Sequence, residues 1–218
     1  MSDNFDFKNE HQLDSEAKNR INHAVRELFS IHDFHQVTMR TIAKKARVGL
    51  NTIYKLYDSK EQMLFDLIDE WLHDLMERTK DHLQGMEDIQ ERLRKIFYIT
   101  LEYYEKNPDV AQIIFFTVPL KTWITDKSYR QKRIMDVYLQ VLKEGQEKGV
   151  LDPSVPARYL LDIINGMIGR IFLMWTYRPY EQPPTVQAKL FFDLIWRAIS
   201  NPKNQGEPTE AYMGFFKK

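Results

Sequence analysis

The stretch TMRTIAKKARVGLNTIYKLYDSKEQML, residues 38–64, decides how the N-terminal part of this chain folds. Thr38 is a suitable N-cap, and the apolar positions that follow it recur at helical spacing: Met39, Ile42, Ala43 and Ala46. A turn at 47–49 contains a glycine, and a second short helix is expected over about 50–57. The pattern therefore predicts two short helices joined by a tight turn.

Ser59 and Gln62 predict the start of a longer helix directly after this pair. A serine at the N-cap with a glutamine three positions later forms a capping box, which satisfies free backbone N–H groups of the first turn. Upstream, Asp14 or Ser15 can cap a first helix whose apolar stripe ends near Phe29. These signals indicate a three-helix headpiece followed by a long fourth helix.

Almost every other segment also has helical periodicity, and none shows convincing strand alternation. Glycines, prolines and polar turns separate these segments, so further helices are expected at about 88–106, 108–118, 127–148, 156–177 and 184–200. The predicted fold is all-α, with about nine helices in total. Its predicted parts are a flexible arm at 1–14, a helix-turn-helix headpiece at 15–62, a larger helical domain at 63–200 and a C-terminal tail at 201–218.

Composition excludes several classes of protein. The chain has 218 residues and no cysteine, so disulfides and thiolate metal sites are absent and a cytoplasmic setting is expected. The polar, acidic N-terminus lacks the features of a signal peptide. The longest apolar run, 163–175, is too short to span a bilayer and contains Asn165 and Arg170. Motifs for metals, nucleotides or nucleophilic catalysis are missing, so no cofactor, no metal site and no enzymatic activity are expected.

Charge is distributed unevenly along the chain, although the formal net charge is zero. Residues 36–60 carry six basic side chains and one acidic side chain, so this segment has a net charge of +5 and the rest −5. Salt screens electrostatic fields within roughly 8 Å at physiological ionic strength, so a polyanion responds to the local charge. The segment with the two short helices is therefore suited to bind nucleic acid.

Two short helices joined by a tight turn, within a basic segment, indicate a helix-turn-helix. The second helix of such a unit enters the DNA major groove. Here Ile53 and Tyr57 would pack inward. Asn51 and Lys55 can hydrogen-bond to bases, and Lys60, beside the free amides of the fourth helix, would bind a phosphate. The predicted DNA contacts are Thr38, Arg40, Lys44, Arg47, Gly49, Leu50, Asn51, Thr52, Tyr54, Lys55 and Lys60.

The same stretch resembles the DNA-binding region of the TetR family of bacterial transcriptional regulators. That family typically has a threonine-led helix with Ile-Ala, a Gly-Val turn, a Thr-Leu/Ile-Tyr-x-x-Phe helix and a Ser-Lys-Glu start to its fourth helix. The upstream segments RINHAVRELF and DFHQVTM also fit, and the resemblance covers about residues 17–77. It implies DNA contacts at the matching positions, which are Thr38, Thr52, Tyr54 and Lys60, and places Lys55 at a variable position that commonly reads bases.

Three departures from the family pattern concern the DNA contacts. Arg47 replaces the usual turn glycine, so the turn has to accommodate a side chain. Leu56 stands where histidine or tyrosine often contacts a phosphate, so no contact is predicted there. Gly49 and Leu50 replace a small polar cap and a polar neighbour, and Leu50 is expected to contact a thymine methyl group instead.

Beyond residue 77 the resemblance rests on helix number and order, and it implies an effector cavity. Aromatic and methionine side chains are abundant there, and most are expected to form a packed core. Arg170, in an apolar run, would need an internal acid or the anionic head of a ligand. The expected effector is hydrophobic or amphipathic, with fatty acyl compounds as the leading candidates. The predicted effector-binding residues are Phe97, Tyr104, Phe115, Phe116, Trp123, Tyr138, Met167, Arg170 and Met174.

The last two predicted helices are expected to form a homodimer, because the resemblance implies that two copies of the pair build a four-helix bundle. Glycines allow close backbone approach on the first of these helices, and the second has an apolar stripe. The predicted interface consists of Gly166, Gly169, Leu190, Leu194, Ile195 and Ile199. Two headpieces would then span half-sites about 34–36 Å apart on a palindromic operator.

The predicted function is a ligand-responsive DNA-binding transcriptional regulator, a repressor that its effector releases from the operator. Effector binding between the fourth helix and helix 156–177 would shift the fourth helix and change the spacing of the headpieces. Two alternatives stay open. A filled core in the larger domain would favour an architectural DNA-binding protein without an effector, and failure to bind DNA would favour a small helical enzyme or lipid-binding protein.

Overall fold

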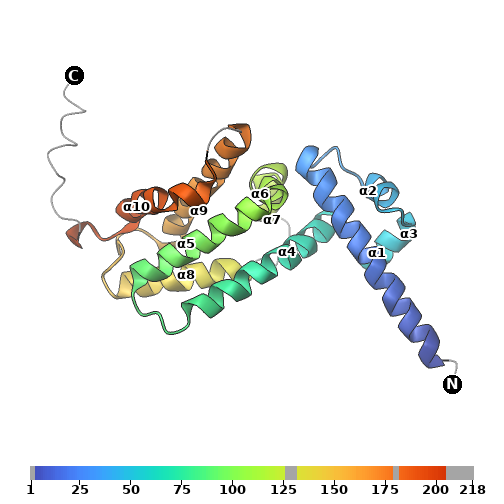
Figure 1. Ribbon diagram of the computed structural model, residues 1–218, viewed down its shortest axis with the longest axis horizontal. Coiled ribbons are helices and arrows are strands. Elements are labelled where there is room, and N and C mark those ends of the chain that lie inside the picture. The colour runs from blue at the N-terminus through green and yellow to red at the C-terminus, as the bar shows by residue number, and fades with distance from the viewer. Residues whose placement is uncertain (1–2, 126–131, 179–181, 205–218) are drawn as a thin grey trace. The chain divides into compact units, whose positions relative to one another are not determined.

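The computed structural model describes residues 3–125, 132–178 and 182–204, with side chains from residue 15 onward except at 120, 124–125 and 132–134. Within these ranges the protein is helical, and its β-type pairing is limited to one antiparallel bridge between Leu151 and Ser200. The prediction of an all-α protein with an N-terminal helix-turn-helix and a larger helical part is confirmed (Figure 1).

The headpiece is built from α1 (Asp3–Ile31), α2 (Met39–Ala46), α3 (Leu50–Leu56) and the first turns of α4 (Lys60–Leu83). Thr38 caps α2 as predicted, because its hydroxyl accepts the N–H of Thr41 while the Thr41 hydroxyl accepts the N–H of Thr38. At α4 the N–H of Gln62 donates to the Ser59 hydroxyl, but the Gln62 amide oxygen accepts the N–H of Asp58. Because α2 packs against α1 and α3 against α2, the short helices form one unit.

The start of α1 differs from the prediction. The helix begins at Asp3, so the predicted cap at Asp14 or Ser15 is wrong, and α1 covers most of the segment predicted as a flexible arm. Neither proline nor glycine interrupts residues 3–31, and acidic residues near the first turn suit the positive end of the helix dipole. A capping signal inside a continuous helix-forming segment does not by itself begin a helix.

The described part of the chain after α4 contains six further α-helices and three short elements. They are α5 (Ile89–Lys106), α6 (Pro108–Gln112), η1 (Ile113–Thr117), α7 (Leu120–Thr125), α8 (Lys132–Glu147), α9 (Ala157–Tyr177), η2 (Pro184–Gln187), α10 (Ala188–Ile199) and η3 (Pro202–Asn204). The predicted helix at 108–118 ends in the π-helical η1, and α7 follows as an additional helix. Pro119 explains the break, because it restricts Val118 to an extended conformation with ψ 119°.

The chain folds as two compact units, residues 1–74 with 107–131 and residues 75–106 with 132–218. This division does not coincide with the predicted boundary between 62 and 63, because α6 and η1 belong with the headpiece. Arg26 of α1 donates to both carboxylate oxygens of Asp109 at 2.6 and 2.7 Å. The Thr117 hydroxyl donates to the Phe29 carbonyl at 2.8 Å. Helix α4 runs from the first unit into the second.

The core of the second unit forms around α5, which contacts α8, α9 and α10 (Figure 1). The hydroxyls of Thr100 and Tyr138 are hydrogen-bonded to each other in this core, and burial raises the pKa of Tyr138 to about 12. Arg92 of α5 pairs with Glu144 of α8. These polar contacts join helices that the hydrophobic side chains hold together.

The first residues of the predicted tail, 201–204, pack within the second unit. The side-chain amides of Asn201 and Asn204 donate to the carbonyl of Gly149 at 3.0 and 2.9 Å, so residues 201–204 are bound to the turn after α8. Residues 205–218, the rest of the predicted tail, lie outside the described residues.

Candidate DNA interface and ligand groove

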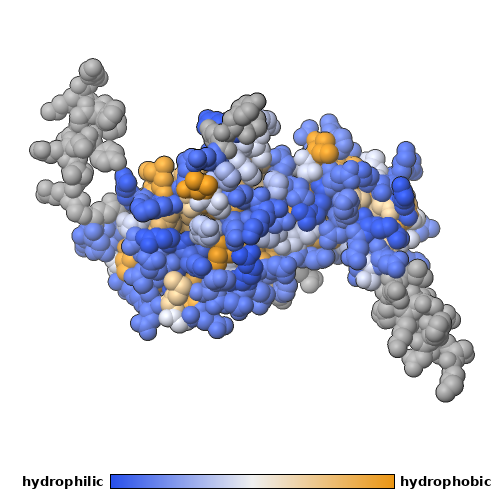
Figure 2. Space-filling view, viewed as in Figure 1, coloured by the Kyte–Doolittle hydropathy of each residue, from blue (hydrophilic) through white to orange (hydrophobic). Residues whose placement is uncertain are grey.

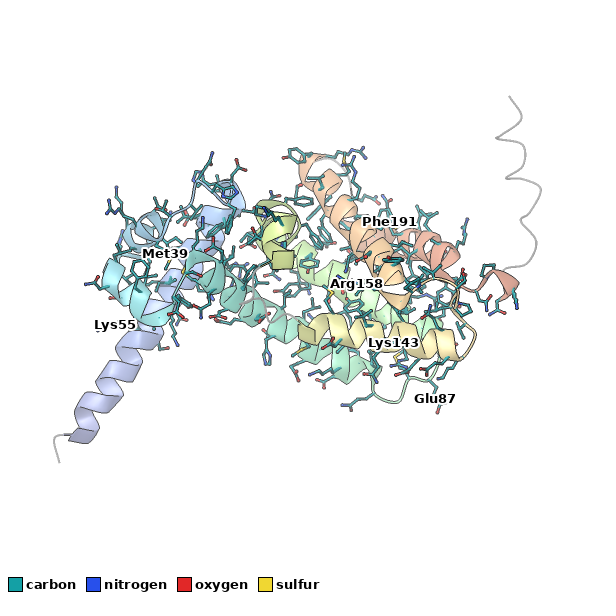
Figure 3. The ribbon with its side chains drawn as sticks, turned by 180° about the vertical axis from the view of Figure 1, so that it is seen from behind. Met39, Lys55, Glu87, Lys143, Arg158 and Phe191 are labelled. Carbon is teal, nitrogen blue, oxygen red and sulfur yellow. The ribbon has the colours of Figure 1, made fainter. Side chains whose placement is uncertain are left out.

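Helix α3 is anchored on one side and exposed on the other. Ile53 is fully buried and Tyr57 is 7% exposed, as predicted. Burial, together with the nearby carboxylates of Glu70 and Asp66, raises the pKa of Tyr57 to about 12, so this anchor stays neutral. On the opposite side the side chain of Lys55 projects away from the headpiece core (Figure 3). A buried anchor with polar groups on the outer face is what a groove-reading helix requires.

The polar face of α3 consists of side chains with different hydrogen-bonding abilities. Asn51 and Lys55 are exposed, and Tyr54 is 52% exposed. Leu50 and Thr52 are half-buried, so only part of each side chain is accessible to a DNA base. Gly49 is the exposed N-cap residue of α3, and no side chain caps the first turn of this helix. The structure thus places five of these predicted DNA residues on one short helix and the sixth, Gly49, at its N-cap.

Three further predicted DNA residues lie on α2 and the turn that follows it. Arg40, Lys44 and Arg47 are all exposed. Their neighbour Lys45 differs, because it forms an ion pair with Glu27 of α1. Thr38 is exposed as well, but its hydroxyl is already engaged with Thr41 in the capping box. The exposed cations of α2 can approach phosphates without breaking a contact within the headpiece.

Lys60 has a different environment from the other predicted DNA contacts. Its ammonium donates to the carbonyls of Phe34 at 2.8 Å and Val37 at 3.0 Å, and it lies 4.0 Å from the centroid of the Phe34 ring. Burial lowers the pKa of Lys60. Sequence reasoning missed these partners, because nothing in the local pattern indicates a contact between residues 26 positions apart.

Arg47 occupies a strained position in the turn between α2 and α3. Its φ is 55°, in the left-handed region. Among the described residues other than glycine, Arg47 alone has a positive φ. The N–H of Arg47 donates to the carbonyl of Lys44 at 3.3 Å, which closes the end of α2. An L-residue with a Cβ atom costs about 1 kcal/mol in this conformation.

We expect Arg47→Gly to raise the free energy of unfolding by about 1 kcal/mol, because glycine adopts this φ without steric cost. Arg47→Ala is the matched control, since it removes the same charge but keeps a Cβ atom. Thermal denaturation of the three proteins checks this expectation. Equal melting temperatures for the glycine and alanine variants would show that the turn stores no strain.

A groove of about 310 Å³ lies in the second unit between α9, η2 and α10. It brings together three of the predicted effector residues, Met167, Arg170 and Met174. Two lining residues outside the predicted effector set, Trp175 and Phe191, add aromatic surface; Phe191 projects from α10 (Figure 3). The other lining residues are Ile171, Arg178, Gln182, Pro184, Gln187 and Leu194, so a mostly apolar lining is combined with two arginines.

The expectation that Arg170 is buried, and therefore needs an internal acid or a ligand head as its partner, is wrong as to burial. Its side chain is exposed, although it lies within an apolar run. The buried side of α9 is formed by Ile168, Gly169 and Phe172, and at 100° per residue Arg170 falls outside that stripe. The guanidinium is therefore available to a ligand at the surface of the groove.

The other predicted effector residues do not line this groove. Phe97, Tyr104 and Tyr138 are core residues of the second unit, where Phe97 lies 6.0 Å from Phe192 and Tyr104 lies 5.6 Å from Phe172 between ring centroids. Their burial fits the expectation that most of these aromatic side chains form a packed core. Phe115, Phe116 and Trp123 are half-buried and belong to the first unit.

The predicted dimer residues fall into two groups. Gly166, Leu190 and Leu194 are on the surface, with Leu190 53% and Leu194 44% exposed. Gly169, Ile195 and Ile199 are buried within the single chain, so they are not accessible to a second copy in this conformation. Helix α10 has two apolar stripes, and the stripe that contains the two isoleucines packs into the core of the second unit.

Sequence reasoning also missed two exposed apolar residues on α9. Tyr159 is 59% and Ile163 40% exposed, and with Gly166 they follow the i, i+4, i+7 spacing of one helix face. We name the exposed residues Tyr159, Ile163, Gly166, Leu190 and Leu194 the α9–α10 face. Figure 2 shows hydrophobic surface over the α10 end of the second unit. The helical spacing could have revealed the α9 part of this face.

Within the described ranges, no helix is both long and apolar enough to cross a membrane. The same residues contain no group of three acidic or histidine side chains placed to hold a metal ion. A capped α2, a tight turn, an anchored α3 and a continuing α4 define the class of helix-turn-helix DNA-binding regulators.

The chain belongs to the tetR family of bacterial regulatory proteins. The family model described as bacterial regulatory proteins, tetR family, matches residues 21–67, and the model described as YsiA-like protein, C-terminal region, matches residues 68–198. The tetR family consists of bacterial regulatory proteins, and the chain is accordingly a DNA-binding transcriptional regulator. The prediction of the family is confirmed.

Individual relatives agree with this assignment. The chain is 23% identical to the HTH-type transcriptional regulator UidR of Escherichia coli K12 over 159 residues, which are 71% of this chain and 81% of the relative. The solved structure of the fatty acid degradation regulator FadR from Bacillus halodurans matches with a TM-score of 0.69 at 19% identity, covering 83% of this chain and 94% of that one. FadR from Bacillus subtilis, in complex with stearoyl-CoA, matches with a TM-score of 0.68 at 19% identity, covering 81% and 96%.

Proposed function

We propose that this regulator is a cytoplasmic repressor that binds a palindromic operator as a homodimer and leaves it when an anionic amphiphile occupies the ligand groove. The observation that carries the DNA part is the arrangement of α3, where buried Ile53 and Tyr57 hold exposed Asn51, Tyr54 and Lys55 on the outer face. Asparagine and lysine can hydrogen-bond to base edges in the major groove. Arg40, Lys44 and Arg47 supply flanking phosphate contacts.

The α9–α10 face supports the proposed homodimer. Its apolar side chains are solvent-exposed in the single chain, and burying them against a second copy would remove that surface from water. A two-fold symmetric pair of headpieces reads two half-sites, so the operator is expected to be palindromic. A single headpiece with one short helix in the groove makes few contacts, and two are needed for specific binding.

The ligand groove supports an anionic amphiphile as the effector. Methionine and aromatic side chains offer an apolar surface, and Arg170 and Arg178 attract a carboxylate or phosphate head. A structurally similar protein, FadR from Bacillus subtilis, was solved with stearoyl-CoA, which is a compound of this chemistry. Leu194 lines the groove and also belongs to the α9–α10 face, so a bound ligand would alter the dimer geometry.

We assign the transmission of ligand binding to the headpiece to α4, because this helix continues from the headpiece into the second unit. A ligand that prefers one dimer geometry shifts the population toward it, and the operator affinity falls if the two α3 helices no longer match the groove spacing. The strength of this coupling cannot exceed the difference in ligand affinity between the two states.

Selection of bound DNA from a random pool, with and without stearoyl-CoA, tests the proposed function. We expect a palindromic consensus from the ligand-free protein and a lower affinity for that consensus when ligand is present. Binding of DNA that no acyl compound changes would favour the architectural alternative. Failure to retain any DNA at low salt would refute the DNA-binding proposal.

The proposed groove is tested by Arg170→Gln, which should weaken binding of stearate about tenfold because a charge-assisted hydrogen bond is lost. Arg158→Gln is the matched control, since Arg158 is an exposed arginine of the same helix that does not line the groove (Figure 3). Isothermal calorimetry measures both. The methyl ester of stearate should bind the two variants equally, and loss of ester binding in Arg170→Gln would contradict a role in recognising the anionic head.

A further inference from the structure

Lys60 is the first residue of α4, and its side chain points toward the connection between α1 and α2 rather than toward the outer face of α3. Its ammonium has three N–H groups, and two of them donate to the carbonyls of Phe34 and Val37. The ammonium also lies 4.0 Å from the centroid of the Phe34 ring, a distance at which the ring attracts a cation. At most one N–H therefore remains for a phosphate.

A lysine at this place has a physical cost. The first turn of a helix is the positive end of its dipole, which disfavours a cation, and burial disfavours the charged ammonium as well. Two carbonyls and an aromatic face offset both effects. Such a compensated arrangement indicates that the charge is used inside the headpiece, where its partners come from a segment 23 to 26 positions earlier.

The partners of Lys60 form the connection between α1 and α2. Phe34 is 3% exposed and packs against Phe29 of α1, with ring centroids 5.9 Å apart. Val37, which is 2% exposed, directly precedes the α2 cap Thr38. The position of this connection sets where α2 begins, and hence where the exposed Arg40 stands.

We propose that Lys60 is a positioning residue for DNA binding: its ammonium holds the connection 34–37 against the first turn of α4 and so places Thr38 and Arg40 at the DNA backbone. This role replaces the phosphate contact that the sequence predicts for Lys60. It rests on the proposed DNA interface, because placing Arg40 matters only if Arg40 contacts DNA.

The positioning role and the phosphate contact predict different properties of the protein without DNA. Lys60→Met removes the contacts to both carbonyls, so we expect the melting temperature of the free protein to fall by roughly 2–4 °C. Hydrogen exchange at the amides of Thr41 and Ile42 should accelerate as well. Lys44→Met, which removes an exposed cation from α2, should change neither quantity. A phosphate contact would leave the free protein unchanged in both variants.

A double-mutant cycle on the selected operator separates the roles in the complex. If Lys60 acts by placing Arg40, then Lys60→Met and Arg40→Gln each weaken binding about tenfold, and the double variant weakens it far less than a hundredfold. The control cycle pairs Lys60→Met with Lys55→Met, whose effects should multiply because Ile53 anchors α3 independently. Lys60→Gln repeats the cycle with a smaller perturbation in case Lys60→Met does not fold.

The outcomes decide between the proposals. An unchanged melting temperature and unchanged exchange in Lys60→Met or Lys60→Gln, together with effects that multiply with those of Arg40→Gln, would overturn the positioning role and restore the phosphate contact. If the wild-type protein retains no DNA from the pool, the proposed DNA interface fails first and the role of Lys60 fails with it. A less stable free protein and a non-multiplicative cycle support the inference.

Discussion

Lys55→Glu is expected to weaken operator binding about a hundredfold or more. Lys55 is exposed on the outer face of α3, and no contact within the headpiece has to change for it to enter the groove. A good base contact is worth roughly 1–3 kcal/mol, and a two-fold symmetric dimer loses it at both half-sites. The introduced carboxylate adds repulsion from the phosphates, which increases the loss further.

The control for this variant is Lys143→Glu, which makes the same charge change on an exposed residue of α8 (Figure 3). Fluorescence anisotropy with the selected operator compares both variants at a fixed salt concentration, because affinities for DNA depend strongly on salt. Both proteins should melt at the wild-type temperature. Equal operator affinities for the two variants would mean that α3 does not read the DNA, and that net charge alone governs binding.

Leu190→Glu is expected to convert the protein to a monomer at micromolar concentration and to reduce operator binding by about two orders of magnitude or more. Leu190 is 53% exposed in the single chain, so a glutamate is tolerated there before association. In the proposed dimer the carboxylate would be buried without a partner, which costs several kcal/mol per copy. A monomer then binds each half-site separately and loses the gain from linked binding.

Leu190→Met is the matched control, because it retains an apolar side chain of similar volume at the same position. Light scattering gives the mass of each variant, and anisotropy gives the operator affinity. Ile163→Glu, on α9, should behave like Leu190→Glu if both residues share one interface. A dimeric Leu190→Glu protein that binds the operator normally would place the dimer interface elsewhere.

Local signals predict the headpiece in detail. Thr38 caps α2, Ile53 and Tyr57 are the buried side of α3, and α4 begins after Ser59. Each of these features depends on a few consecutive residues, through side-chain caps and the periodicity of one helix. The short helices offer little room for alternatives, because only one phase buries their few apolar residues.

The same reasoning fails for the long, strongly apolar helices of the second unit. Helix α9 has an exposed Arg170 and a buried Gly169, and α10 has one exposed and one buried apolar stripe. A helix that is apolar over most of its surface does not reveal which side faces its own core and which side is left for a second copy or a ligand. That choice depends on the neighbouring helices, which come from distant parts of the chain.

Sequence alone therefore suffices for the helical class, the helix-turn-helix, the family and the outward face of α3, because local spacing and capping encode them. The ligand groove, the α9–α10 face and the partners of Lys60 depend on the packed chain. Lys60 meets carbonyls 23 and 26 positions away, and Arg26 meets Asp109 at a separation of 83. Such contacts form only when packing brings remote segments together, since no local pattern of caps or periodicity specifies them.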